Sequence, residues 1–83
     1  MSNSHFIKKN LKLSLAFDDY IAKYPSVLNK IPNDSLIIFT VKGDEEFNKM
    51  SWIVAGRAQV EKQKIVEARK EDNRWKIQKF SFA

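Results

Sequence analysis

Residues 36–41 read LIIFTV, and this stretch decides the fold class of the chain. The segment is short, almost wholly apolar and rich in β-branched side chains, which is typical of a strand and not of a helix. It lacks the alternation of apolar and polar residues that marks a half-exposed strand, so both of its faces should be covered. We therefore predict that residues 36–41 form a central strand.

A long helix is expected before this strand, over residues 4–24, with Ser4 as its N-cap. At about 100° per residue, six large side chains fall on one face and form the predicted core stripe. These are Phe6, Leu13, Phe17, Tyr20, Ile21 and Tyr24. Pro25 disfavours helical geometry at Tyr24, so the helix should end there.

Pro25 can also open a second, short helix, which we expect over residues 26–31. This helix would offer Val27, Leu28 and Ile31 to the core before Pro32 ends it. The pair Asn33-Asp34 then supplies a turn into the strand.

A second long helix is expected from about residue 45 to 61, capped by Asp44 after a turn at Gly43. Its predicted inner face consists of Phe47, Met50, Ser51, Val54, Ala55 and Ala58. Residues 64–70 and 74–80 then read as two strands, joined by a polar loop at 71–73 that tolerates left-handed backbone. A strand, a helix and a strand in succession predict a parallel crossover, and the last two strands predict an antiparallel hairpin.

The fold class that follows is α/β (α+β), in the order α-α-β-α-β-β. Two main helices and one short helix should pack on a three-stranded mixed sheet. The 83 residues are enough for one small domain, which we place over residues 1–83.

Several kinds of chemistry are excluded by composition. The chain has no cysteine and one histidine, His5, so it has neither disulfides nor a thiolate metal site. Gly43 and Gly56 are its only glycines, which excludes the Gly-rich loops that bind phosphate groups. Asp18 and Asp19 are adjacent on a helix and point about 100° apart, so they cannot share a proton. We expect no enzymatic activity and no cofactor.

Both long helices carry apolar residues away from their core stripes. On the first helix these are Ile7, Leu11 and Leu15, and on the second Trp52, Ile53, Gly56 and Val60. Large exposed apolar patches usually mark an interface. We predict self-association as a homodimer, with Trp52 as the first candidate for an anchor and a different protein as the other candidate partner. Gly56 would suit a close approach of backbone or a bulky side chain. Two alternatives stay open: the helices pack on each other, or the tail at residues 80–82 covers one of them.

The formal net charge is +5 and the pI is about 9.6. The alternative function is therefore nucleic-acid binding by the C-terminal hairpin, through Lys64, Arg69, Lys70, Arg74, Lys76 and Lys79. A simpler explanation is that these charges keep an edge hairpin soluble. Strand alternation puts Trp75 and Ile77 on one face and Arg74, Lys76 and Gln78 on the other, so Trp75 is expected in the core.

The sequence also bears on the compartment. Lys8, Lys9 and Lys12 interrupt the first apolar segment, which does not resemble a secretory signal. No run approaches the roughly 18 apolar residues that a membrane span needs. We expect a cytoplasmic protein with no membrane partner.

Several short motifs follow one another in a definite order along the chain. They are Asn10-Leu11-x-Leu13, Phe17-x-x-Tyr20, Tyr24-Pro25, Ile31-Pro32 and the apolar strand that follows. In this order they resemble a family of small uncharacterised prokaryotic proteins, a domain of unknown function, over about residues 8–70. The resemblance implies an α/β fold, and neither an activity nor functional residues. The chain departs from the pattern at residues 61–64, which lack a glycine, and its last strand is expected to be an addition.

Overall fold

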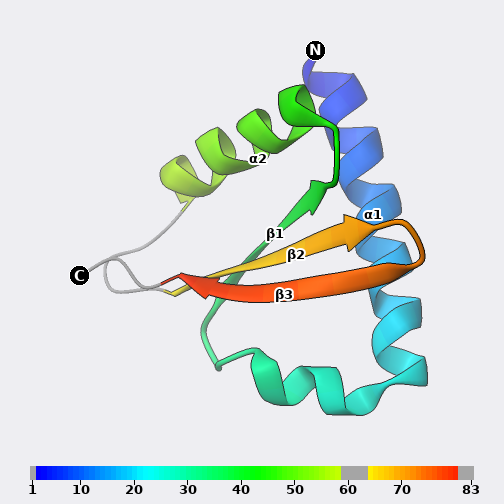
Figure 1. Ribbon diagram of the computed structural model, residues 1–83. Coiled ribbons are helices and arrows are strands. Elements are labelled where there is room, and N and C mark those ends of the chain that lie inside the picture. The colour runs from blue at the N-terminus through cyan, green and yellow to red at the C-terminus, as the bar shows by residue number, and fades with distance from the viewer. Residues whose placement is uncertain (1, 59–63, 81–83) are drawn as a thin grey trace.

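The computed structural model describes residues 2–58 and 64–80. Its elements, drawn in Figure 1, are α1 (Asn3–Lys23), the 3-10 helix η1 (Pro25–Lys30), β1 (Leu36–Val41), α2 (Glu45–Ala58), β2 (Ile65–Glu71) and β3 (Arg74–Phe80). The predicted order α-α-β-α-β-β and the three-stranded mixed sheet are confirmed.

The sheet has the strand order β1-β2-β3. Strand β1 runs parallel to β2, with Leu36 opposite Ile65, and β3 runs antiparallel to β2, with Arg74 opposite Glu71. The central strand is thus β2, and the prediction that residues 36–41 form the central strand was wrong. The unbroken apolar run of β1 has another cause, because helices cover both faces of this edge strand.

One face of the sheet, the α1 face, packs against α1 and η1. Its core contains Phe17, Val27, Phe39, Ala68 and Trp75. The Phe17 ring lies 5.0 Å from the Trp75 ring and 5.7 Å from the Phe39 ring, measured between centroids. Aromatic pairs at such distances stabilise a core beyond the area they bury.

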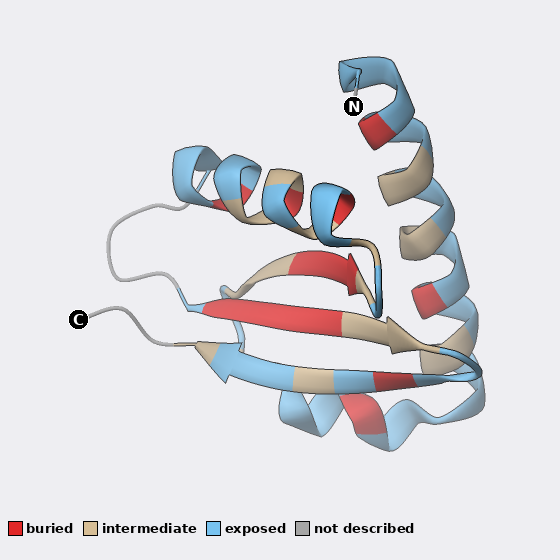
Figure 2. Ribbon diagram, turned by 45° about the horizontal axis from the view of Figure 1, so that its top comes forward, coloured by how far each residue is buried: buried red, intermediate tan, exposed pale blue. Residues whose placement is uncertain are grey.

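The opposite face, the α2 face, packs against α2. Its core contains Ile38, Ala55 and Ile65, with Trp52 and Phe80 packed against them. Figure 2 shows the buried residues in the first part of β2 and in the middle of β1, where helices lie on both faces.

The first long helix begins and ends slightly earlier than predicted. Its N-cap is Ser2, whose hydroxyl accepts a hydrogen bond from the backbone N–H of His5 at 3.2 Å, and not Ser4. Phe6 and Phe17 of the predicted stripe are buried, but Tyr24 is 55% exposed. Tyr24 leaves the stripe because the helix ends at Lys23 and Tyr24 has a non-helical backbone (φ −130°, ψ 71°).

The short helix η1 begins at Pro25, one residue before the predicted range. Within this helix Val27 is buried and Leu28 is exposed, and Ile31, the residue after the helix, is half-buried. A six-residue helix with one side on the sheet has room for few inward side chains.

The start of α2 is tied to α1. Asp44 caps α2 by accepting a hydrogen bond from the backbone N–H of Phe47 at 3.2 Å, and it forms an ion pair with Lys9 of α1. The rings of Phe6 and Phe47 lie 5.2 Å apart beside this ion pair. These contacts fix the N-terminal turns of the two helices against each other.

The inner face of α2 is narrower than predicted. Phe47, Ser51 and Ala55 are buried, whereas Val54 and Ala58 are exposed. Helix α2 rests mainly on β1, and the buried residues lie four positions apart along one line of the helix, with Trp52 packing on the sheet beside them. Residues 59–61 of the predicted helix lie outside the described residues.

The hairpin turns at Asp72-Asn73, and Asp72 has a φ of +55°. The predicted left-handed backbone is therefore confirmed. Trp75 is buried on the α1 face and Ile77 is half-buried there, while Arg74, Lys76 and Gln78 are exposed on the α2 face.

Candidate functional site

Three aliphatic side chains form an exposed row on α1, which we name the α1 row. Ile7 is 63% exposed, and Leu11 and Leu15 are each 57% exposed. Their spacing of four residues puts them in one ridge along the helix. The packing of α1 against the sheet does not use this ridge, as the sequence predicts for Leu11 and Leu15.

A groove between α1 and α2 continues the α1 row. It has a volume of about 480 Å³ and is lined by Asn3, Phe6, Ile7, Met50, Ile53, Val54 and Arg57. Ile7 comes from α1 and Ile53 from α2, so the groove joins the apolar residues that both helices leave exposed. Ile53 and Val54 are each 40% exposed. Val54 was predicted to face the core and is a surface residue that the sequence pattern missed.

Trp52, the predicted anchor, lies against the sheet. Its ring is 5.1 Å from that of Phe80 in an edge-to-face arrangement, and it packs on the Ile38–Ala55–Ile65 cluster. Phe80 thus covers Trp52, which is one of the two alternatives left open by the sequence.

Of the other two residues predicted on this face of α2, the structure describes Gly56. Gly56 is exposed, and no atom beyond its chain neighbours and the adjoining turns of its own helix backbone lies within 4 Å of the place where its Cβ would be, so no close approach to it occurs in the described residues. Val60 lies outside the described residues.

The six basic residues of the alternative function do not share one surface. Arg69, Arg74 and Lys76 lie on the α2 face, and Arg69 pairs with Glu71 at 3.5 Å. Lys70 lies on the α1 face, where its Nζ sits 5.3 Å from the centre of the Trp75 ring. Lys79 is opposite Val66, toward the other end of the hairpin, and Lys64 precedes β2.

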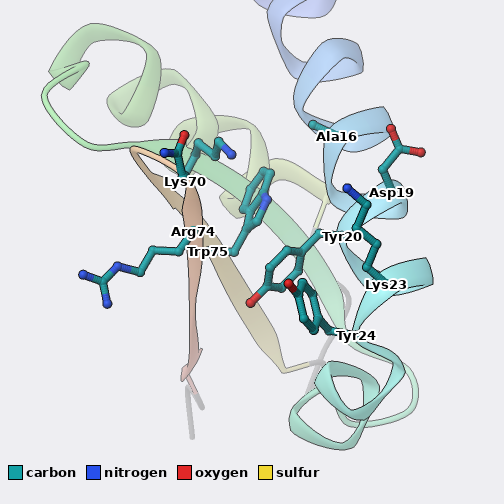
Figure 3. A pocket seen from close by; sticks show the side chains of 9 residues that line it. Ala16, Asp19, Tyr20, Lys23, Tyr24, Lys70, Arg74 and Trp75 are labelled. Carbon is teal, nitrogen blue, oxygen red and sulfur yellow. The ribbon is translucent and has the colours of Figure 1, made fainter.

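A pocket of about 380 Å³ lies where the last turns of α1 meet the hairpin turn (Figure 3). Its lining is Ala16, Asp19, Tyr20, Lys23, Tyr24, Lys70, Asn73, Arg74 and Trp75. Figure 3 shows the guanidinium of Arg74 pointing away from the other lining side chains. The sequence alone does not predict this pocket, because residues more than forty positions apart form it. The spacing of Asp19, Tyr20 and Lys23 on one side of α1 was its only local signal.

A buried polar pair lies on the α2 face. The carboxylate of Glu67, which is 5% exposed, accepts a hydrogen bond from the Thr40 hydroxyl at 2.9 Å. A guanidinium nitrogen of Arg69 lies 3.8 Å from the same carboxylate. The pair joins β1 to β2.

Residues 2–58 and 64–80 contain no group of three or more His, Asp or Glu side chains placed to hold a metal ion. In the same residues, no helix has the length and apolar character needed to cross a membrane.

Comparison with known proteins gives one result. A model of a family of unknown function, DUF5647, matches residues 5–80. The match includes β3, so the expectation that the last strand is an addition was wrong. Neither the curated proteins nor the solved structures include a match. The chain therefore belongs to the family of unknown function DUF5647.

Proposed function

We propose that this protein is a non-enzymatic interaction module that self-associates as a two-fold homodimer through the α1 row and the adjoining groove. The observation that carries the proposal is the exposure of Ile7, Leu11 and Leu15, each more than half exposed on one ridge. A small domain gains from covering such a continuous apolar surface, and surfaces of this kind are typical of protein interfaces.

The spacing of the row supports a second copy as the occupant. Residues four apart form the ridge that packs most often into the equivalent ridge of another helix, at a crossing angle of about −50°. A two-fold axis near Leu11 would set Ile7 of one protomer against Leu15 of the partner subunit. Such an interface stops at the dimer, because both copies use the same surface to form it.

The charges of α1 also suit an antiparallel arrangement. Lys8 and Lys12 lie in its N-terminal half, whereas Asp18 lies in its C-terminal half, and all three are exposed. Antiparallel packing brings the two lysines of one helix toward Asp18 of the other. Such complementarity favours one register of two copies over others.

The groove would extend the interface onto α2, with Ile53 and Val54 adding apolar area. Trp52 would support α2 from the side of the sheet and would not itself contact the partner subunit, because its ring packs on Phe80 and the sheet. Gly56 has no contact in the described residues that supports a role, and Val60 lies outside those residues. We place the module in the cytoplasm, a proposal supported by the absence of cysteine.

The test is solution molar mass, measured by size exclusion with light scattering at low and high salt. We expect a dimer at both salts, because the buried surface is mainly apolar. Leu11→Glu should give a folded monomer, since it sets two carboxylates against each other at the two-fold axis. The matched control is Leu28→Glu, because Leu28 is 52% exposed and lies on η1, away from the α1 row. A monomeric wild-type protein, or equal dissociation by Leu28→Glu, would contradict the proposal.

A further inference from the structure

The pocket in Figure 3 is independent of the proposed dimer surface. Its α1 residues, Ala16, Asp19, Tyr20 and Lys23, lie roughly 80–180° around the helix axis from Leu11. The pocket shares no lining residue with the α1 row or with the adjoining groove.

One side of the pocket is aromatic. The rings of Tyr20 and Tyr24 lie 5.0 Å apart at an angle of 49°, and Trp75 completes the wall beneath Lys70. Tyr24 is 55% exposed, although its ring packs against Tyr20. An exposed aromatic ring beside a hollow offers a flat surface on which a planar ring can stack.

The rest of the pocket is mainly cationic. Lys23 comes from the end of α1 and Lys70 from the end of β2, so the two ammonium groups belong to different walls. Neither forms an ion pair with a carboxylate in residues 2–58 or 64–80. Arg74 lies at the rim, and Asp19 is the one acidic side chain in the lining. The lining therefore favours an anion, while Asp19 can accept hydrogen bonds from hydroxyl or amino groups.

We propose that this pocket binds a nucleoside phosphate, with its base stacked on Tyr24 and its phosphate held between Lys23 and Lys70. The volume of about 380 Å³ is within the range of sites for small molecules. A phosphate without a ring would leave the aromatic wall unused, and a neutral aromatic compound would leave both ammonium groups unused. The ligand can come from two sources, a free nucleotide or a nucleotide within a single strand of nucleic acid.

The test uses adenosine monophosphate, adenosine and inorganic phosphate as separate probes, titrated at low salt into the isotopically labelled full chain. The expected result is saturable change in the amide NMR signals of Lys23, Tyr24 and Lys70 and in the indole signal of Trp75. Adenosine and phosphate should each bind at least about tenfold more weakly than the nucleotide, because each makes only one kind of contact.

Two variants and one control separate this pocket from general charge attraction. Lys70→Gln and Tyr24→Ala should each weaken nucleotide binding by about tenfold, while the exposed residue Lys76 on the other face gives the control Lys76→Gln, with unchanged binding. Spectra of the free variants show whether each is folded. No saturable change with any probe, or equal weakening by Lys76→Gln, would overturn the proposal.

A short single-stranded oligonucleotide distinguishes the two sources. Tighter binding than the mononucleotide, at the same four residues, assigns the site to nucleic acid. Equal or weaker binding assigns it to free nucleotides. Binding of the oligonucleotide that leaves these four residues unchanged would contradict the proposal for this pocket.

Discussion

The side-chain amide of Asn48 forms two hydrogen bonds to the backbone of Val41 at the outer edge of β1. The N–H of Val41 donates to Asn48 Oδ1 at 2.7 Å, and Asn48 Nδ2 donates to the carbonyl oxygen of Val41 at 2.8 Å. A neighbouring strand would form the same pair of bonds. Asn48 thereby provides hydrogen-bond partners for backbone groups at the end of β1, along an edge that no other strand in the described residues pairs with.

Replacing Asn48 by Ala should destabilise the protein by about 1–2 kcal/mol, because the N–H of Val41 loses its acceptor and the carbonyl oxygen of Val41 keeps only the backbone N–H of Asp44 as a donor. Urea denaturation followed by circular dichroism measures the change. Lys49→Ala is the control, since Lys49 is the exposed neighbour in the same helix and should alter stability little. Equal stability of Asn48→Ala and the wild type would show that water replaces the amide without cost.

The buried pair of Thr40 and Glu67 gives a second prediction. Thr40→Val keeps the shape of the side chain but removes the hydroxyl that donates to the Glu67 carboxylate at 2.9 Å. Leaving that buried carboxylate short of a donor should cost about 1–3 kcal/mol in the free energy of unfolding. Thr40→Ser retains the hydroxyl and should recover part of the loss. If Thr40→Ser is the less stable of the two variants, packing of the methyl group outweighs the hydrogen bond.

Asp44 should give the protein part of its resistance to acid. The hydrogen bond from the Lys9 ammonium lowers the pKa of Asp44 most, followed by the one from the backbone N–H of Phe47. A carboxyl whose pKa is lowered on folding stabilises the protein above its unfolded pKa, and this contribution is lost as the pH falls through its folded pKa.

Asp44→Asn keeps a side-chain oxygen for the helix cap but removes the charge. It should be less stable than the wild type at neutral pH, and the difference should shrink as the pH falls below about 4. Urea denaturation across this range measures it. Asp34→Asn, at an exposed position before β1 and away from α1, is the control. A difference that stays constant with pH would show that the charge of Asp44 has no part in stability.

The sequence predicted what depends on local signals. Pro25 and Pro32 bound the short helix, and Asp72 allows the left-handed turn of the hairpin, so element order and approximate bounds followed from the residues themselves. The position of β1 in the sheet did not follow. An apolar run records how many faces of a strand are covered, and it carries no information on how many of its edges are paired.

The candidate surfaces likewise divide into those that local spacing predicts and those that depend on how distant segments meet. Helical spacing alone identifies Leu11 and Leu15 as side chains outside the core stripe. Whether Phe80 reaches Trp52 depends on the register of β2 and β3, in which Phe80 lies opposite Ile65. The pocket beside Tyr24 was missed for a similar reason, because its walls meet only when the hairpin turn lies against the end of α1.

The contrast between Trp52 and Leu11 gives the last prediction. Trp52 packs on Phe80 and the sheet, so Trp52→Ala should lower the free energy of unfolding by about 2–4 kcal/mol. Leu11 is 57% exposed, so Leu11→Ala should change the stability of the monomer by less than about 0.5 kcal/mol while weakening self-association.

Urea denaturation at protein concentrations too low for association measures the stability of the monomer. Molar mass at higher protein concentrations measures self-association. Trp52→Phe is the matched control, because it keeps an aromatic ring near Phe80 and should recover most of the lost stability. A Trp52→Ala variant that is as stable as the wild type but monomeric would reverse this assignment. Trp52 would then be the anchor that its position in the sequence first suggested, and its contact with Phe80 would be a support for the interface rather than for the core.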